Sequence, residues 1–167
     1  MRLWLLRHAK SSWDDADLAD IDRPLAPRGE RAARAMASYL DREGIRPQLV
    51  LCSPAARARG TLELVRPSLG EPEVLVEPEL YTFDREPLAE RLQRVSDTVA
   101  SAMLVGHNPA MHALAVWLAR TGERLEELRT KYPTGALAEL ELDAPTWAEV
   151  GAGSAILTRF VPPRELS

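Results

Sequence analysis

The stretch from Arg2 to Trp13, RLWLLRHAKSSW, decides how the rest of the chain is organised. It opens with the apolar run 3–6, which is too short to cross a membrane and is typical of a strand buried on both faces of a sheet. The run changes abruptly to Arg7, His8 and Lys10, with hydroxyl side chains behind them. Because ligands of open α/β sheets bind beyond the carboxyl ends of the strands, these basic groups predict an anion-binding site there.

Composition and charge limit what the protein can be. A chain of 167 residues fits one domain, residues 1–167, which would bury roughly 68–70% of its unfolded surface. The net charge of −4 argues against a nucleic-acid partner, which needs a basic face. One cysteine permits no internal disulfide, no apolar run approaches the ~20 residues of a membrane helix, and no secretory signal is visible. We therefore expect a cytoplasmic protein without a membrane partner, and the sequence leaves its oligomeric state open.

Strands and helices alternate along the chain. Further strands are predicted at residues 49–52, 74–76, 102–105, 136–142, 147–150 and 155–161. Helices are predicted at residues 28–43, 54–65, 86–95 and from 109 onward. In 136–142, apolar residues alternate with Leu137, Glu139 and Glu141, so that strand is expected to expose one face. The alternation predicts an α/β fold with a mostly parallel sheet.

Several local signals mark where the helices begin and end. Pro27 suits the first position of a helix, and Gly44 is typical of the residue just beyond the end of one. Ser53 and Asn108, each followed by proline, are predicted to cap the helices that come after them. An acidic, proline-containing connection, residues 13–27, separates the opening strand from the first helix and is long enough to be functional. We expect it to be a solvated loop that could hold a basic substrate or a cation.

Three of the predicted buried strands are followed by side chains of catalytic type. Arg7 and His8 follow the first strand, Arg57 lies one turn into the helix after Ser53, and His107 follows the strand at 102–105. In a parallel sheet these three ends lie along one edge, so the groups can converge although they are about 50 residues apart in sequence. Two imidazoles, two guanidiniums and helix amino termini together predict a phosphate pocket in which one imidazole could act as nucleophile.

Four motifs resemble the histidine phosphatase (phosphoglycerate mutase-like) superfamily and, within it, the small SixA-type phosphohistidine phosphatases. They are LLRHAKSSW at 5–13, DRPL at 22–25 with RG at 28–29, SPAARA at 53–58 and VGHNP at 105–109. The resemblance spans roughly residues 3–112, with YPTG at 132–135 as a weaker match. It implies a phosphoglycerate mutase-like, three-layer αβα sandwich. Where relatives usually have glycine and an acidic residue after the histidine, this chain has Ala9 and Lys10.

Carried over residue by residue, the resemblance implies a phosphatase that forms a phosphohistidine on His8. Arg7 and Arg57 would then hold the phosphoryl oxygens, and His107 would donate to the group in transfer. Ser11 would make a lesser contact at the edge of the pocket. Neither a metal nor another cofactor is implied.

The leaving group bears on the choice of substrate. Many relatives use a carboxylic acid after the second motif to protonate the leaving oxygen, and Glu79 lies in about that region, although its context PELY matches poorly. Imidazole, with a reference pKa near 6.5, leaves far more readily than an alkoxide, so a pocket without an assured acid favours a phosphoramidate. We therefore expect the partner to be a protein that carries phosphohistidine, with a small phosphorylated molecule as the other candidate.

Two other functions stay open on the sequence. One is a phosphatase for small phosphate esters, with Glu79 or an aspartate of the acidic connection as proton donor; the other is a phosphate- or phosphoprotein-binding module without turnover. Other chemistries fit less well. Cys52 and Arg57 are one residue closer than in the loop of cysteine phosphatases, which favours a buried structural thiol. His112 follows His107 by five residues, off the four-residue spacing of two metal ligands on one helix face.

Overall fold

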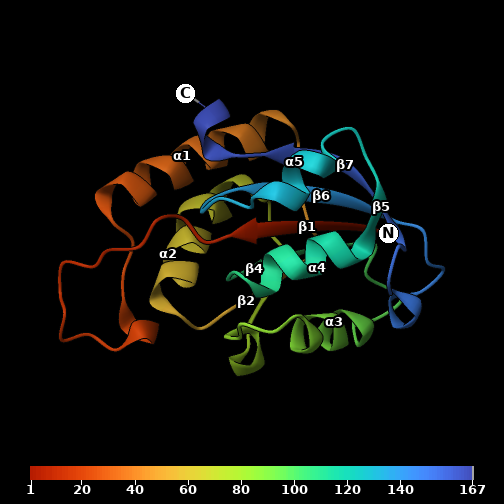
Figure 1. The fold of residues 1–167 in the computed structure, drawn as a ribbon, viewed down its shortest axis with the longest axis horizontal. Helices are drawn as coiled ribbons and strands as arrows, with labels where there is room; N and C mark the ends of the chain where they lie inside the picture. The colour runs from red at the N-terminus through yellow and green to blue at the C-terminus, as the bar shows by residue number, and fades with distance from the viewer. Residues whose placement is uncertain (167) are drawn as a thin grey trace.

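One seven-stranded sheet forms the centre of the molecule (Figure 1). The computed structural model describes residues 1–166, and the strand order in the sheet is β3-β2-β4-β1-β6-β7-β5. The strands are β1 (Arg2–Arg7), β2 (Leu49–Cys52), β3 (Glu73–Val76), β4 (Ser101–Gly106), β5 (Ala119–Thr121), β6 (Leu137–Leu142) and β7 (Ala155–Val161). Of the six neighbouring pairs, four are parallel and two, β1–β6 and β6–β7, are antiparallel. The prediction of a mostly parallel sheet is confirmed.

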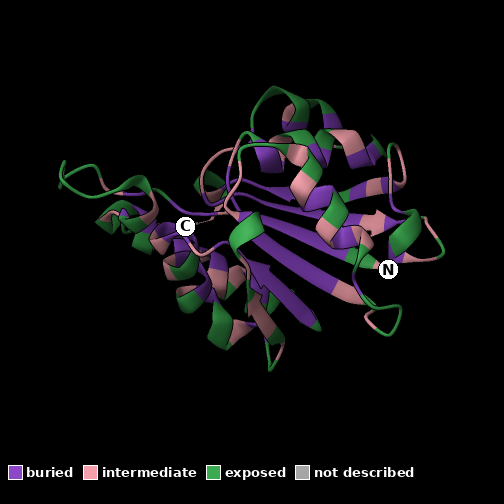
Figure 2. Ribbon diagram, turned by 90° about the horizontal axis from the view of Figure 1, so that it is seen from below, coloured by how far each residue is buried: buried purple, intermediate pink, exposed green. Residues whose placement is uncertain are grey.

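Helices cover both faces of the sheet and complete a three-layer αβα sandwich (Figure 2). Alternation along β1 shows why two layers form: Leu3 and Leu5 pack into one core with α3, α4 and α5, whereas Trp4 and Leu6 pack into the other with α1 and α2. The helices are α1 (Pro27–Arg42), α2 (Ala56–Val65), α3 (Arg85–Gln93), α4 (Ala110–Leu118) and α5 (Leu125–Thr130). Within residues 1–166, none has the length and apolar character needed to cross a membrane.

The start of α1 is held against the segment that follows β1. The backbone N–H of Ala26 donates to the carbonyl oxygen of Lys10 at 2.9 Å. Gly29, in the first turn, approaches so closely that a Cβ built on it would lie 2.0 Å from that same oxygen. At the other end, Gly44 has φ +65°, as expected for a residue that ends a helix. A missing side chain therefore fixes where α1 sits relative to Lys10.

One prediction near the carboxyl end of the chain is wrong, and two short elements were not predicted. Residues Trp147–Glu149 form a short 3-10 helix, not a strand, and the buried Trp147 indole donates to the Val99 carbonyl oxygen at 2.7 Å. The edge strand β5 and the short helix α5 carry too few residues to show a period, and the sequence did not indicate them. The other predicted strands are confirmed, and the helices are confirmed with ends shifted by one or two residues.

The prediction that β6 exposes one face is also wrong. The strand lies between β1 and β7 with helices on both sides, so Leu137 and Glu139 are buried. The Glu139 carboxylate is stabilised there because it accepts hydrogen bonds from the indole of Trp4 at 2.7 Å and from the Thr158 hydroxyl at 2.8 Å. Arg159 completes the arrangement with an ion pair at 3.4 Å. A buried carboxylate with three partners produced the alternating pattern that is usually typical of a half-exposed strand.

We predict that Gly29→Ala destabilises the protein by about 2 kcal/mol or more, because the new Cβ collides with backbone and not with a flexible side chain. Thermal and urea unfolding would measure the change. Gly151→Ala is the matched control, since a Cβ there meets only the Glu149 carbonyl oxygen, at 4.0 Å. Equal unfolding midpoints for the two variants would contradict the close packing of α1.

Candidate active site

The strand ends bring the predicted side chains to one pocket of about 330 Å³. His8 follows β1, Arg57 lies in the first turn of α2, and His107 follows β4, all on the edge where these parallel strands end. The lining residues are Arg7, His8, Lys10, Ser11, Trp13, Asp20, Arg23, Arg57, Phe83, His107, Asn108 and Thr134. Five of them were candidates on sequence grounds: Arg7, His8, Ser11, Arg57 and His107.

The backbone fixes the orientation and the tautomer of His8. Its Nδ1 lies 2.7 Å from the carbonyl oxygen of Ala9, and because a carbonyl only accepts, Nδ1 carries the proton. Burial, with the positive charges of Arg57 and Arg7, lowers the pKa of His8 to about 4. The ring is therefore neutral at pH 7, and its Nε2 has a free lone pair. That is the state in which an imidazole can attack phosphorus.

Ser53 orients the second imidazole. Its Oγ lies 2.6 Å from Nε2 of His107 and accepts the N–H of Ala55 at 3.2 Å, so the hydroxyl proton is available to His107. With Nε2 accepting, Nδ1 of His107 carries the proton. Burial and the neighbouring His8 lower the pKa of His107 to about 3, so this ring is also neutral at pH 7. The two ring centroids are 5.2 Å apart. Ser53 thus orients a catalytic-type ring and does not cap α2 as predicted, since that helix begins at Ala56.

Unpartnered nitrogens gather in this pocket. The Nε atoms of Arg7 and Arg57 and Nδ1 of His107 are buried without a hydrogen-bond partner among the described residues. Such a group costs about 1–3 kcal/mol when it is left unsatisfied. Burial lowers the pKa of Arg7, but a guanidinium still keeps its proton in a protein. Three unpartnered nitrogens, two of them on guanidiniums, fit an anion with several acceptor oxygens.

Asp20 is a pocket residue that the sequence did not single out. Its carboxylate accepts from Nη2 of Arg57 at 2.9 Å, and its backbone oxygen accepts from Nη1 at 2.7 Å. The Tyr81 hydroxyl donates to the same carboxylate at 2.5 Å, and Arg23 adds a contact at 3.2 Å. The Tyr81 hydrogen bond, followed by those of Arg57 and Arg23, lowers the pKa of Asp20 to about 2. The acidic connection is largely exposed, as predicted, and the Asp20 side chain itself stays 45% exposed while its carboxylate reaches Arg57; the aperiodic stretch around it gave no signal of this contact.

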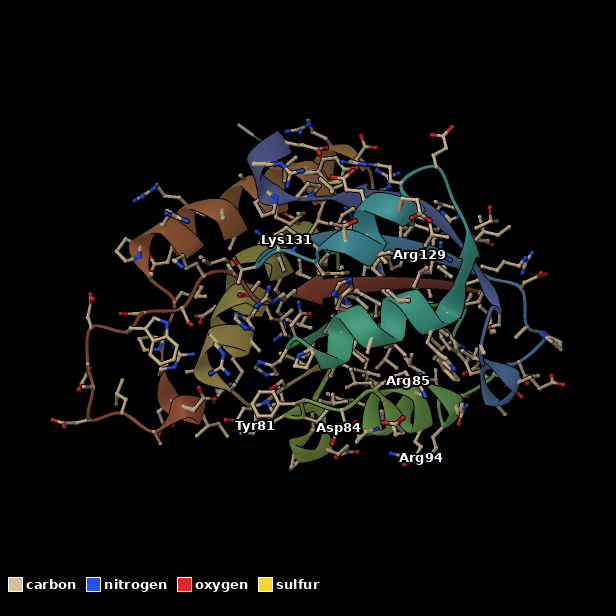
Figure 3. The ribbon with its side chains drawn as sticks, viewed as in Figure 1. Tyr81, Asp84, Arg85, Arg94, Arg129 and Lys131 are labelled. Atoms are coloured by element: carbon tan, nitrogen blue, oxygen red, sulfur yellow. The ribbon has the colours of Figure 1, made fainter. Side chains whose placement is uncertain are left out.

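The structure also places the two minor candidates. Ser11 is 9% exposed and lines the pocket, but its Oγ accepts a hydrogen bond from Arg23 at 2.9 Å, so it supports that guanidinium. Arg23 also stacks over the exposed ring of Trp13, with 3.5 Å between its Cζ and the ring centroid. Glu79 is not among the pocket residues: it is exposed, and its carboxylate binds Arg94 at 3.3 Å. Figure 3 shows Tyr81 left of centre in the lower half of the view and Arg94 further to the right, below α3.

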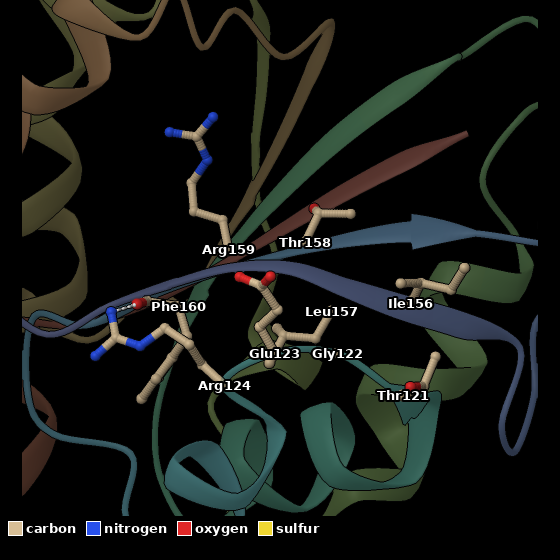
Figure 4. Close-up of a pocket in the computed structure, with 9 residues that line it drawn as sticks. All are labelled: Thr121, Gly122, Glu123, Arg124, Ile156, Leu157, Thr158, Arg159 and Phe160. Atoms are coloured by element: carbon tan, nitrogen blue, oxygen red, sulfur yellow. Dashed lines mark hydrogen bonds between the residues drawn. The ribbon is translucent and has the colours of Figure 1, made fainter.

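Other reactive side chains serve the core. Nε2 of His112 lies 2.6 Å from the Leu128 carbonyl oxygen, and burial raises the pKa of the Cys52 thiol to about 12. Within residues 1–166, no cluster of three His, Cys, Asp or Glu side chains could hold a metal ion. A cavity of about 470 Å³ beside β7 shares no lining residue with this pocket, and its Arg124 is already bound to Glu127, Glu165 and the Phe160 carbonyl (Figure 4).

In the protein without a bound anion, the His8 ring should stay neutral down to about pH 4, because burial lowers its pKa. Only the neutral ring is nucleophilic. We predict a ring titration midpoint near 4, and a higher midpoint in Arg57→Gln because one of the positive charges that depress it is lost. Nitrogen-15 NMR of the imidazole measures both values. Arg59→Gln, an exposed change on the same helix, is the control and should leave the midpoint unchanged. A wild-type midpoint near 6.5 would contradict this.

Asp20 should compete with a bound anion for Arg57. Replacing it in Asp20→Asn removes a like charge from the pocket, so we predict that inorganic phosphate binds about two- to fivefold more tightly. Isothermal calorimetry measures the affinity. Asp14→Asn, at an exposed position of the same connection, is the control and should change nothing. Weaker phosphate binding in Asp20→Asn would instead mean that Asp20 holds Arg57 in its binding position.

Similar proteins carry the same architecture. An uncharacterised protein of Mycobacterium tuberculosis is 39% identical over 166 residues, covering 95% of this chain and all of that protein. The phosphohistidine phosphatase SixA of Escherichia coli is 32% identical over 148 residues, covering 86% of each. A solved structure of SixA complexed with tungstate superposes with a TM-score of 0.82 at 29% identity and covers the whole of both chains. A structure from Nakamurella multipartitia, described as SixA, gives a TM-score of 0.85 at 28% identity, covering 97% of this chain and 95% of that one.

A family model also matches the part of the sequence that contains the first motifs. The model of the histidine phosphatase superfamily (branch 1) matches residues 3–89, which include β1, the acidic connection and the first turn of α2. The match accounts for His8, Arg7 and Arg57, whereas His107 lies beyond it and is tied to them by the geometry of the pocket. This chain belongs to branch 1 of the histidine phosphatase superfamily.

Proposed function

We propose that this phosphatase removes the phosphoryl group from phosphohistidine in a protein, by way of a phosphohistidine on His8. The ionisation of Asp20 carries the proposal. It is the carboxylate among the pocket residues, and its pKa of about 2 leaves it without a proton to give at pH 7. Glu79 is bound to Arg94 outside the pocket. A substrate whose leaving group needs little protonation fits such a pocket best.

In the first step, Nε2 of His8 attacks phosphorus, and the phosphorus–nitrogen bond of the substrate breaks with its electron pair going to the substrate imidazole. That ring leaves as neutral imidazole, because its other nitrogen has taken a proton from solvent before the bond breaks. Arg7 and Arg57 hold the oxygens of the transferring group, and Nδ1–H of His107 donates to it. In the second step, water attacks the phosphorus on His8. The oxygen–phosphorus bond forms, Nε2 recovers its lone pair, and the protons of water go to the released phosphate and solvent.

The rim of the pocket suits a large substrate. Trp13 and Phe83 line it and are 74% and 58% exposed, which is unusual for large apolar side chains. Such residues can pack against the surface of another protein around its phosphorylated side chain. The names of two relatives agree with this, since SixA of Escherichia coli is a phosphohistidine phosphatase and a SixA structure holds tungstate, a tetrahedral oxyanion.

A substrate panel tests the proposal. We predict that phosphate release from a phosphohistidine protein has a kcat/KM at least about 100-fold above that from sugar phosphates and nucleotides, because alkoxides leave poorly without an acid. His8→Ala should abolish both turnover and the acid-labile radioactive label on the enzyme. Arg42→Ala, an exposed change outside both the pocket and its surroundings, is the control and should keep the label. Equal rates on phosphohistidine and alkyl phosphates would refute the substrate class, and turnover in His8→Ala would refute the nucleophile.

A further inference from the structure

A second groove, of about 470 Å³, opens beside the catalytic pocket and is continuous with it. The two share Lys10 and Thr134. The rest of the groove comes from the first turns of α1, the segment after α5 and the carboxyl-terminal segment. Its lining residues are Lys10, Arg28, Arg31, Ala32, Ala35, Lys131, Pro133, Thr134, Pro162, Pro163, Arg164 and Leu166.

The groove is strongly positive. Five of its twelve lining residues are cations, and none is a carboxylate. Lys10, Arg28, Arg31 and Lys131 are exposed and make no ion pair or side-chain hydrogen bond with the residues that the structure describes, whereas Arg164 binds Glu127 at 3.0 Å. The chain as a whole has a net charge of −4 and pairs thirteen of its arginines. Four unpaired cations around one groove therefore make it a local exception to the charge of the protein.

The backbone holds these cations at a fixed place relative to His8. The contact of Gly29 with the carbonyl of Lys10 sets the first turn of α1, and so Arg28 and Arg31, beside the strand that ends in the nucleophile. On the other wall, the N–H of Gly135 donates to the His8 carbonyl oxygen at 2.9 Å. Lys131 precedes that anchored segment and lies near the carboxyl end of β1 (Figure 3). The groove is thus built into the same framework as the catalytic pocket.

We propose that this groove binds an acidic segment of the substrate protein, next to its phosphohistidine in space or sequence; this rests on the function proposed above. The four unpaired cations come from three separate segments and are all exposed, so they offer successive contacts to an extended chain of carboxylates. A compact second phosphate would need donors that converge on one point. Charge complementarity of this kind mainly raises the association rate and sets the orientation of docking.

Matched phosphohistidine peptides test the groove. One peptide carries four glutamates beside the phosphohistidine, and the other carries four glutamines. We predict that wild type has a higher kcat/KM for the acidic peptide than for the glutamine peptide. The double variant Arg31→Gln/Lys131→Gln should lower kcat/KM for the acidic peptide about fivefold, through a higher KM, and leave kcat/KM for the glutamine peptide unchanged. Arg42→Gln is the control: this arginine is exposed at the far end of α1 and forms no ion pair within residues 1–166. Raising the salt from ~20 to ~300 mM should shrink the wild-type preference.

The outcomes separate the two proposals. Hydrolysis of both peptides at equal rates by wild type, or an equal loss on both in the double variant, would overturn the groove and leave the phosphohistidine proposal intact. A preference for small bisphosphates over the acidic peptide that disappears in the double variant would also overturn it, because the occupant would then be a second phosphate. Failure of wild type to hydrolyse either peptide, with turnover of a phosphate ester, would count against the proposed function itself.

Discussion

The register of β4 between β1 and β2 is the constraint on which the site depends. Arg7 pairs with Gly106 and Cys52 with Val105, so the chain leaves all three strands at nearly the same level. The backbone N–H groups of His8 and Ser53 then donate to the carbonyl oxygens of Gly106 and Val105, each at 3.0 Å, which extends the pairing one residue beyond the strands. A shift by one residue would point the side chains to the other face of the sheet and separate the two imidazoles.

Burial then gives the gathered groups their chemical character. Removal from water keeps both imidazoles neutral at pH 7. A hydrogen bond to a carbonyl in His8 and one from a hydroxyl in His107 place the proton on Nδ1 of both rings, so that His8 has a free Nε2 lone pair and His107 a free Nδ1–H. Positive charge close to these rings strengthens the effect, because Arg57 disfavours a further cation in the pocket. The same low exposure makes each unpartnered donor costly, and a tetrahedral anion can satisfy several at once.

Charge is distributed unevenly over a protein that is acidic overall. The acidic connection projects at one end of the molecule (Figure 1) and returns one carboxylate, Asp20, to Arg57, while the unpaired cations line the neighbouring groove. An incoming anionic substrate therefore meets repulsion from one rim and attraction from the other. For the protein substrate proposed above, this asymmetry would favour one orientation of approach.

By itself the sequence determined the α/β class and the central buried strand, and it predicted that Arg7, His8, Arg57 and His107 meet in one pocket. This was possible because strand ends and helix starts are local signals and parallel strands share an edge. It did not indicate Asp20, Tyr81 or the role of Ser53, because their contacts join segments more than 30 residues apart and no local pattern encodes them. The burial of Glu139 could not be predicted for the same reason, because its three partners, Trp4, Thr158 and Arg159, come from other strands. Tertiary structure alone decided the tautomers, the depressed pKa values and the removal of Glu79 from the pocket.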